Sequence, residues 1–344
     1  MTRYLVTGGT GYLGRQLVKL LVEQGRQVRV LVREGSDTSG LDGVELVQGD
    51  LCDAADIARA LDGVQRVFNL AAETRDDQPD ARYERVNHQA VTQLLEAASG
   101  KVERLLHTSH YYAIGRSGEP RSVPDFVNDE YWVHSPDDMH DAHEQSKCDA
   151  ENAVNQRVSL GEPVLALVPT MLYGPEARDV SGVDGLATGN RIVRMLANHA
   201  AGRYGGMPGD GRQAWNLVHV QDVAAAQLQV MDADDGSGVW PPPRWTHWRY
   251  ICGGDNVSLA QLFERFGALA GVPAPAAQGV RKQGLLGRLF AGGAGEASTR
   301  DLIDSHCWAF SCELAEAEWG YKHRSLDEGL AQTVDWMRSC RLLD

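Results

Sequence analysis

The chain has 344 residues, of which 43% are hydrophobic and 23% charged, an ordinary balance for a globular protein with a substantial core. Its 47 acidic and 33 basic side chains give a formal net charge of −14, which argues against nucleic acid or an anionic membrane as a partner. There is no apolar run of membrane-spanning length, no secretory leader pattern and no metal-like spacing among the six cysteines, so we expect a cytoplasmic protein with free thiols.

The first half of the chain alternates between strand-like and helical segments. Strands are predicted at 4–6, 27–33, 44–51, 64–72 and 102–109, and helices at 15–25, 53–63 and 83–100. This alternation is typical of a parallel, doubly wound α/β sheet with helices on both faces. Ligands of such sheets bind outside the carboxyl ends of the strands.

A glycine-rich turn joins the first strand to the first helix in the stretch "TGGTGYLG" (7–14). Gly8 permits a tight turn, Gly11 lets the backbone approach a pyrophosphate, and Gly14 lets the helix pack closely on the strand. The helix N-terminus supplies N–H groups and a partial positive charge for phosphates. The turn therefore predicts a dinucleotide site.

Arg33 ends the second predicted strand, at the position that selects between the two nicotinamide cofactors. A site for NAD has Asp or Glu there, whereas a guanidinium suits a 2′-phosphate. A solvent-facing arginine beside Glu34 is the alternative interpretation. We expect NADPH.

The second half is harder to interpret. Helices are predicted at 189–202 and at 258–271, where Ser258 is a plausible N-cap, and a strand at 249–254. We expect a Rossmann-type domain over 1–173, to which 214–232 returns, and a smaller C-terminal α/β substrate lobe over 174–213 and 233–344. Trp240, Trp245 and Trp248 lie in a proline-rich segment that either packs on the protein itself or contacts a partner.

Several motifs in order resemble the extended short-chain dehydrogenase/reductase family, in its dihydroflavonol-reductase and nucleotide-sugar-epimerase branch. They are "TGGTGYLG", "GDL" (49–51), "NLAA" (69–72), "HTSHYYAIG" (107–115), "HEQSKCDAE" (143–151) and "PTMLYGP" (169–175). The resemblance implies cofactor contacts with Asp50 and Leu51 at the adenine, Ala71 and Ala72 at the pyrophosphate and ribose, and Lys147 at the nicotinamide ribose. It also implies that Asn87 supports the strand ends, although a polar helix cap is nearly as plausible there. The remaining implied contacts are Gly8, Thr10, Gly11, Tyr12, Leu13, Gly14, Pro169 and Leu172.

The usual active-site residues of this family are altered here. The family uses a Tyr four residues before the Lys as proton donor, and a Ser that polarises the carbonyl. Those positions hold His143 and His110 in this chain, with Ser109 just upstream, so only Lys147 is kept. The departure is similar to that in simocyclinone-type ketoreductases of angucyclinone pathways.

Three accounts of this site remain open. His143, aided by His110, replaces Tyr as general acid, although the neighbouring ammonium should lower its pKa. In the second account the site supplies hydride geometry, and the proton comes from water or from an acidic hydroxyl of the substrate. In the third the protein is a non-catalytic NADP(H)-binding sensor.

The favoured function is an NADPH-dependent ketoreductase of an aromatic or polyketide natural product, as in antibiotic biosynthesis. The aromatic residues that follow position 110 suit a flat substrate. The expected substrate contacts are Tyr111, Tyr112, Glu73 and Met171. A nucleotide-sugar epimerase or dehydratase is the alternative enzyme, and Arg191, Arg194 and Arg212 are available for its phosphates. Apart from the small-molecule substrate, the candidate partner is a second copy of the chain, in a homodimer.

His134, His140 and His143 fall close together in the sequence and could bind zinc if the loop and the helix converged. We predict no metal site there, because the helix directs His143 towards the cofactor.

Overall fold

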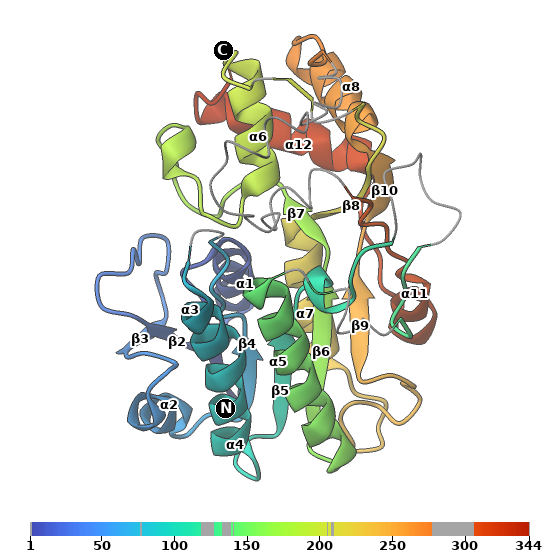
Figure 1. Cartoon of the computed structure of the whole chain (residues 1–344). Coiled ribbons are helices and arrows are strands. Elements are labelled where there is room, and N and C mark those ends of the chain that lie inside the picture. The colour runs from blue at the N-terminus through green and yellow to red at the C-terminus, as the bar shows by residue number, and fades with distance from the viewer. Residues whose placement is uncertain are drawn as a thin grey trace, which may run out of the picture.

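The computed structural model describes residues 2–75, 78–117, 127–132, 139, 141–204, 206–207, 210–276 and 306–343. A seven-stranded parallel sheet forms the centre of the larger part of the molecule (Figure 1). Its strands, in spatial order, are β3 (Glu45–Gln48), β2 (Gln27–Val32), β1 (Arg3–Thr7), β4 (Arg66–Asn69), β5 (Arg104–Thr108), β6 (Val164–Pro169) and β9 (Arg249–Cys252). The order reverses between β1 and β4, as in a doubly wound Rossmann-type sheet, so the predicted fold class is confirmed.

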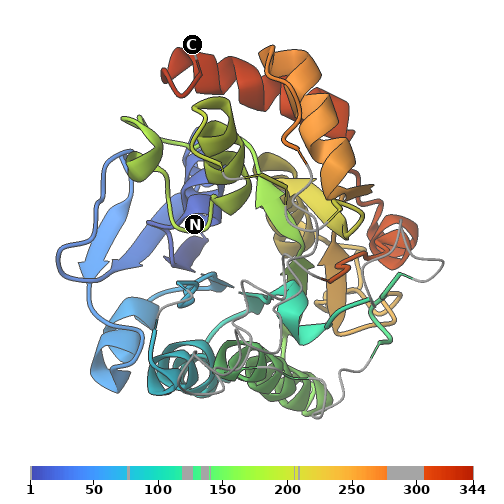
Figure 2. The same cartoon turned by 45° about the horizontal axis from the view of Figure 1, so that its top comes forward.

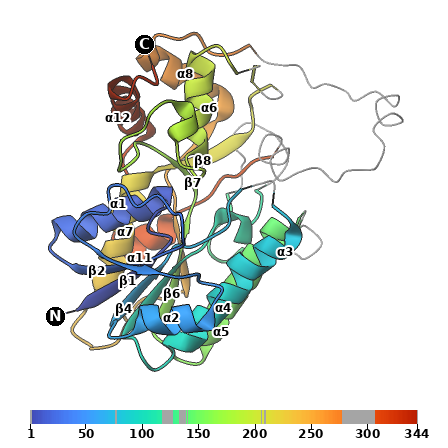
Figure 3. The same ribbon diagram turned by 90° about the vertical axis from the view of Figure 1, so that its left-hand side faces the viewer.

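Helices cover both faces of this sheet and bury apolar side chains against it (Figure 3). One face is covered by α1 (Tyr12–Glu23), α7 (Val220–Asp232) and α11 (Glu313–Trp319), and the other by α2 (Ala54–Leu61), α4 (Ala90–Ala98) and α5 (Ala142–Ser159). A short α3 (Asp80–Tyr83) and a π-helical turn (Glu84–Gln89) lead directly into α4.

The smaller lobe is built on a three-stranded sheet with the order β10 (Asp255–Ser258), β8 (Ala214–His219), β7 (Met171–Tyr173). Three helices pack with it around a second apolar core: α6 (Arg191–Ala200), α8 (Leu259–Ala270) and α12 (Leu326–Ser339) (Figure 2). Ser258 caps α8 in a reciprocal capping box with Gln261, as its position in the sequence predicts. Short 3-10 turns lie at Tyr111–Ala113 and Val183–Gly185.

The boundary between the two parts differs from the expected one. β8 belongs to the small sheet, whereas α7 packs on α1 and β9 extends the large sheet beyond β6. Trp240 and Trp245 are buried in the core under α1 and α7, and the Trp240 indole donates a hydrogen bond to the Val230 carbonyl oxygen at 2.9 Å. The segment 220–252 therefore returns to the larger domain, and its first two tryptophans are core residues.

α5 differs from the other sheet-covering helices in what it buries. The face that it turns inward is polar in its first half, with His143, Ser146 and Lys147, and apolar further on, with Ala150 and Val154. Burying polar side chains costs free energy unless they are hydrogen-bonded or bind a ligand. The polar first half of α5 therefore indicates a functional site. Among the described residues, no helix is both long and apolar enough to cross a membrane.

Candidate active site

The glycine turn lies at the carboxyl end of β1, beside the point where the strand order reverses. Gly8 has a φ of +69°, and a Cβ there would lie 2.6 Å from the Leu70 carbonyl carbon. A Cβ at Gly14 would lie 2.1 Å from the Gly8 carbonyl oxygen, so larger residues are excluded at both positions. At Gly11 the one close atom is the Gly8 oxygen, at 3.2 Å, and Gly11 is exposed. Gly11 thus leaves the N-terminus of α1 open to a phosphate.

The other residues of the turn hold it in place. The Tyr12 hydroxyl donates to the Gly174 carbonyl oxygen at 2.7 Å, and Arg15 Nε donates to the Thr10 carbonyl oxygen at 3.0 Å. Leu13 is buried in the core under α1. The side chains of Tyr12 and Leu13 are thereby engaged with the protein, so a cofactor would meet these positions through their backbone.

Arg33 is exposed after β2, and its guanidinium forms no hydrogen bond or ion pair with any residue that the structure describes. The loop that follows it is held by Arg15, which donates to the carbonyl oxygens of Ser39 and Asp37 and pairs with the Asp37 carboxylate at 3.3 Å. Arg178 pairs with the same carboxylate at 3.3 Å. Arg15 and Arg178 were not singled out in the sequence, because their partners are backbone oxygens of a loop with no recognisable pattern.

The residues expected at the adenine and pyrophosphate lie at the ends of β3 and β4. Asp50 Oδ1 accepts the Cys52 N–H at 2.9 Å, and Leu51 is buried beside α2. Ala71 and Ala72 are half-buried, and the Ala71 N–H donates to Thr7 Oγ1 at 3.3 Å. All four thus lie at the carboxyl edge of the sheet, where ligands of such sheets bind.

Asn87 connects the loop after β4 to α5. Its Oδ1 accepts the Glu73 N–H at 2.8 Å, and its Nδ2 donates to the Glu73 carbonyl oxygen at 3.2 Å and to Ser146 Oγ at 3.1 Å. Ser146 in turn donates to the His143 carbonyl oxygen at 2.8 Å. Asn87 therefore does not cap a helix and instead positions the first turns of α5.

His143 is buried, with 2% of its surface exposed, between aromatic rings. It stacks on Tyr83 with ring centroids 4.6 Å apart and planes within 7°, and the Tyr112 ring meets it edge-on at 5.1 Å. The His110 ring lies 6.1 Å away. Neither ring nitrogen of His143 has a hydrogen-bond partner among the described residues. A buried imidazole without a partner is costly, which marks it as a group that meets a ligand.

The tautomer of His110 follows from its surroundings. The Tyr112 N–H donates to His110 Nδ1 at 3.2 Å, so that nitrogen carries no proton. In the neutral ring the proton is then on Nε2, and His110 is a hydrogen-bond donor at that atom.

The electrostatics keep both imidazoles neutral. Burial, and then the positive charges of Lys147 and Arg191, lower the pKa of His143 to about 3. Burial and the charge of Lys147 also bring the pKa of His110 well below its usual value. The pKa of Lys147 itself falls to about 8, because burial outweighs the attraction of Glu73.

The chain matches a family model, the NAD dependent epimerase/dehydratase family, over residues 4–240. The protein belongs to this family. It is 31% identical over 277 residues to sterol demethylase protein B of Methylococcus capsulatus, which covers 79% of this chain and 75% of the relative. It is 32% identical over 277 residues to a putative dihydroflavonol 4-reductase of Synechocystis, covering 79% and 74% of the two chains. The crystal structure of gox2253 superposes with a TM-score of 0.80 at 27% identity, with both chains fully covered.

Within this epimerase/dehydratase-family site, Ser109 does not face His143. Its hydroxyl donates to Glu151 Oε1 at 2.5 Å, and the other oxygen of that carboxylate pairs with Arg249 Nη1 at 2.5 Å. A carboxylate is a strong acceptor, so this buried network holds the hydroxyl away from the imidazoles. The Ser109 hydroxyl is therefore engaged by Glu151, and we assign it no catalytic role.

The expected substrate contacts divide into two groups. Tyr111 stacks on His110 at 4.2 Å and, with Tyr112 and Trp308, joins the apolar core of the smaller lobe. Met171 is buried in that core too. Pro169 is the last residue of β6, and Leu172 follows Met171 in β7. Glu73 is buried and paired with Arg75 at 2.9 Å and Arg82 at 3.3 Å. Burial acts to raise the pKa of Glu73, but these arginines outweigh it and bring it to about 2.

Tyr83, which stacks on His143, was missed in the sequence. Tyr83 lies four residues before Asn87, a spacing that places both on one helix face, and this was the available signal. Arg191 was predicted as a possible phosphate ligand of the alternative epimerase, and in the structure its guanidinium donates to the Thr74 carbonyl oxygen. Of the three histidines in the zinc hypothesis, His134 and His140 lie outside the described residues.

Proposed function

We propose that this oxidoreductase-family protein is an NADPH-dependent ketoreductase of an aromatic or polyketide-type ketone. The observation that carries the proposal is the pair of neutral imidazoles, His110 and His143, 6.1 Å apart beside the buried Lys147. A carbonyl oxygen placed between two N–H donors and an ammonium is polarised towards hydride attack. The alternative functions, a nucleotide-sugar epimerase or a non-catalytic NADP(H) sensor, are outcomes of the test below.

The chain's own residues fit a nicotinamide dinucleotide. The glycine turn leaves no side chain over the N-terminus of α1, and Lys147 forms no hydrogen bond or ion pair with the described part of the chain. The turn would hold the pyrophosphate, Asp50 and Leu51 the adenine end, and Lys147 the nicotinamide ribose. When bound, the cofactor supplies the hydride.

The two imidazoles act as hydrogen-bond donors. Because its pKa is about 3, His143 is uncharged near neutral pH and cannot deliver a proton as an imidazolium. A neutral imidazole still donates an N–H to an oxygen that gains charge in the transition state. The proton then comes from water or from an acidic hydroxyl of the substrate, which the positive charges of Lys147 and Arg191 make a stronger acid by lowering its pKa.

The aromatic character of the site and the names of relatives support the substrate class. Tyr83 and Tyr112 lie against His143. A further relative, 27% identical over 241 residues, is named a 4-hydroxy-2-methyl-3-oxo-4-farnesyl-3,4-dihydroquinoline-1-oxide ketoreductase, from Stigmatella aurantiaca. A ketone on an aromatic ring system of an antibiotic-type natural product is the substrate class proposed.

Replacing His143 with Phe tests the role of this ring. We expect kcat/KM for NADPH-dependent reduction of a panel of aromatic ketones to fall about 10-fold to 100-fold, because one donor to the oxyanion is lost. Wild-type activity should show no break near pH 6.5, since the ring is neutral on both sides of it. His88→Phe, a partly exposed histidine of the turn before α4, is the control.

Three results separate the functions. A rate unchanged by His143→Phe contradicts the donor role. Conversion of a nucleotide sugar without net consumption of NADPH indicates the epimerase. Stoichiometric NADPH binding with no turnover of either substrate class indicates the sensor.

Replacing Arg33 with Ala tests the cofactor preference. A guanidinium bonded to a 2′-phosphate contributes about 1.5–3 kcal/mol, so we expect the Kd of NADPH to rise at least 10-fold and that of NADH to stay unchanged. Fluorescence titration of both cofactors measures this, with the exposed Arg203→Ala as control. The predicted preference for NADPH is contradicted if the wild-type protein binds NADH and NADPH with equal affinity.

A further inference from the structure

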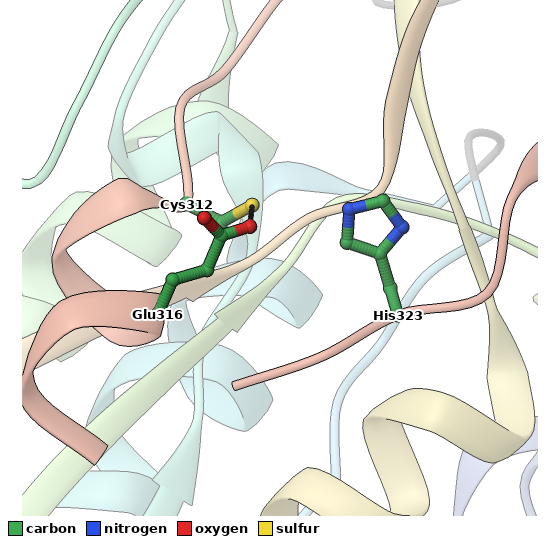
Figure 4. Close-up of side chains that lie close together, drawn as sticks. All are labelled: Cys312, Glu316 and His323. Atoms are coloured by element: carbon green, nitrogen blue, oxygen red, sulfur yellow. Dashed lines mark hydrogen bonds between the residues drawn. The ribbon is translucent and has the colours of Figure 1, made fainter. Parts of the chain in front are cut away.

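Near the C-terminus, three side chains with metal-binding atoms come together outside the active site. Cys312 precedes α11, Glu316 lies one helical turn further on, and His323 lies in the loop between α11 and α12 (Figure 4). One donor atom from each residue lies within 4.8 Å of the other two. Their spacing matches no common sequence pattern, which is why the sequence predicts no metal site here.

The His323 ring is oriented as a ligand. Its Nδ1 is 3.0 Å from the Arg324 carbonyl oxygen, and because a carbonyl only accepts, Nδ1 carries the proton. The lone pair of the neutral ring is then on Nε2. Figure 4 shows one ring nitrogen turned towards Cys312 and Glu316 and the other turned away. Histidines that bind metals commonly donate their second N–H to a backbone carbonyl in this way.

Cys312 and Glu316 supply the other two donors. The Cys312 thiol is buried and donates to Glu316 Oε1 at 3.4 Å. Burial and the neighbouring carboxylate raise the pKa of Cys312 to about 12, so without a metal the sulfur keeps its proton. A bound cation displaces that proton to solvent and takes up the thiolate. Glu316 is exposed and His323 half-buried, which leaves a way in from solvent.

The loop that carries His323 is already fixed by other contacts. The Tyr321 hydroxyl donates to the Gly253 carbonyl oxygen at 2.7 Å, and Arg324 pairs with Asp222 at 2.7 Å. The loop that carries His323 therefore needs little further ordering when an ion binds beside α11.

We propose that Cys312, Glu316 and His323 bind one Zn²⁺, with water as the fourth ligand. Thiolate, imidazole and carboxylate are the donors that zinc takes, and three protein ligands leave its fourth position open. The ion joins α11, which packs on the large sheet, to the loop that leads into α12 of the smaller lobe. Zinc thereby stabilises the attachment of the smaller lobe, independently of the reductase site.

Cobalt and zinc titrations test the proposal on the full-length protein after removal of metals with a chelator. We expect one equivalent of Co²⁺ to produce a thiolate-to-metal charge-transfer band and the visible bands of a four-coordinate site, both abolished by one equivalent of Zn²⁺. Zn²⁺ should also raise the unfolding temperature. Cys312→Ser should remove the charge-transfer band, and His323→Gln should weaken Zn²⁺ binding at least 10-fold, or 1.4 kcal/mol.

Two control variants identify the site. Cys340→Ser removes another free thiol, and His88→Gln breaks a second group of ligand-type side chains formed with Glu84 and Asp149. Both should bind Zn²⁺ as the wild type does, and circular dichroism establishes that all four variants fold. The proposal is overturned if the wild type binds less than one equivalent, if cobalt gives no thiolate band, or if Cys312→Ser binds unchanged.

Discussion

Replacing Lys147 with Met lowers kcat/KM for ketone reduction by about 10²–10³-fold and raises the Kd of NADPH at least 10-fold. Methionine keeps the length of the side chain but loses the ammonium, and with it the charge-assisted bond to the cofactor ribose and the positive charge beside the reacting oxygen. Steady-state kinetics and fluorescence titration measure the two effects. Lys19→Met, on the exposed face of α1 with 54% of its side chain accessible, is the matched control.

The same variant should not lose stability, which separates a site residue from a structural one. Burial lowers the pKa of Lys147 from 10.5 to about 8, so the folded state disfavours its charged form by about 3 kcal/mol. Removing that charge leaves the free energy of unfolding at pH 7 unchanged or higher. A variant that is both inactive and destabilised, or one that is fully active, contradicts the assigned role.

Acidification from pH 6.5 to pH 5 should destabilise the protein steeply. Burial lowers the pKa of several histidines, to about 3 for His107 and His143 and to about 4 for His219, and that of His110 is well below its usual value as well. In the unfolded chain their pKa is about 6.5, so below that pH the unfolded state binds protons that the native state does not. The stability is therefore complete above pH 6.5 and falls as the pH drops towards 4.

Each histidine removes up to about 1.4 kcal/mol per pH unit in this window, so roughly 2 kcal/mol each is lost by pH 5. Urea unfolding at pH 7.5, 6.5, 5.5 and 5.0 measures the loss. His143→Phe should reduce the slope of the free energy of unfolding against pH by the contribution of one proton, about 1.4 kcal/mol per pH unit at most. His88→Gln replaces a partly exposed ring and should leave this slope unchanged. A free energy of unfolding that stays level between pH 6.5 and 5 would contradict the buried neutral state.

Local patterns were sufficient for the sheet and the dinucleotide turn. The strand–glycine–helix order at 3–23, the alternation up to β5 and the Ser258 cap depend on neighbours within a few residues, and the structure has them at the predicted places. The domain boundary was placed less well, because whether a strand such as β9 joins the large or the small sheet depends on its pairing with β6, in which Ala166 pairs with Arg249, 83 residues further along the chain.

The sequence by itself determined the fold class, the position of the cofactor turn and the replacement of the expected Tyr by His143, because each is written in residues close together in the chain. The tertiary structure alone decided the ionisation and the neighbours of that histidine. Its stacking on Tyr83, the effect of the Arg191 charge on its pKa and the bond of Ser109 to Glu151 all join segments from separate elements. The same holds for the Cys312–Glu316–His323 cluster, because no local pattern in the chain reveals that the fold will bring these three side chains together.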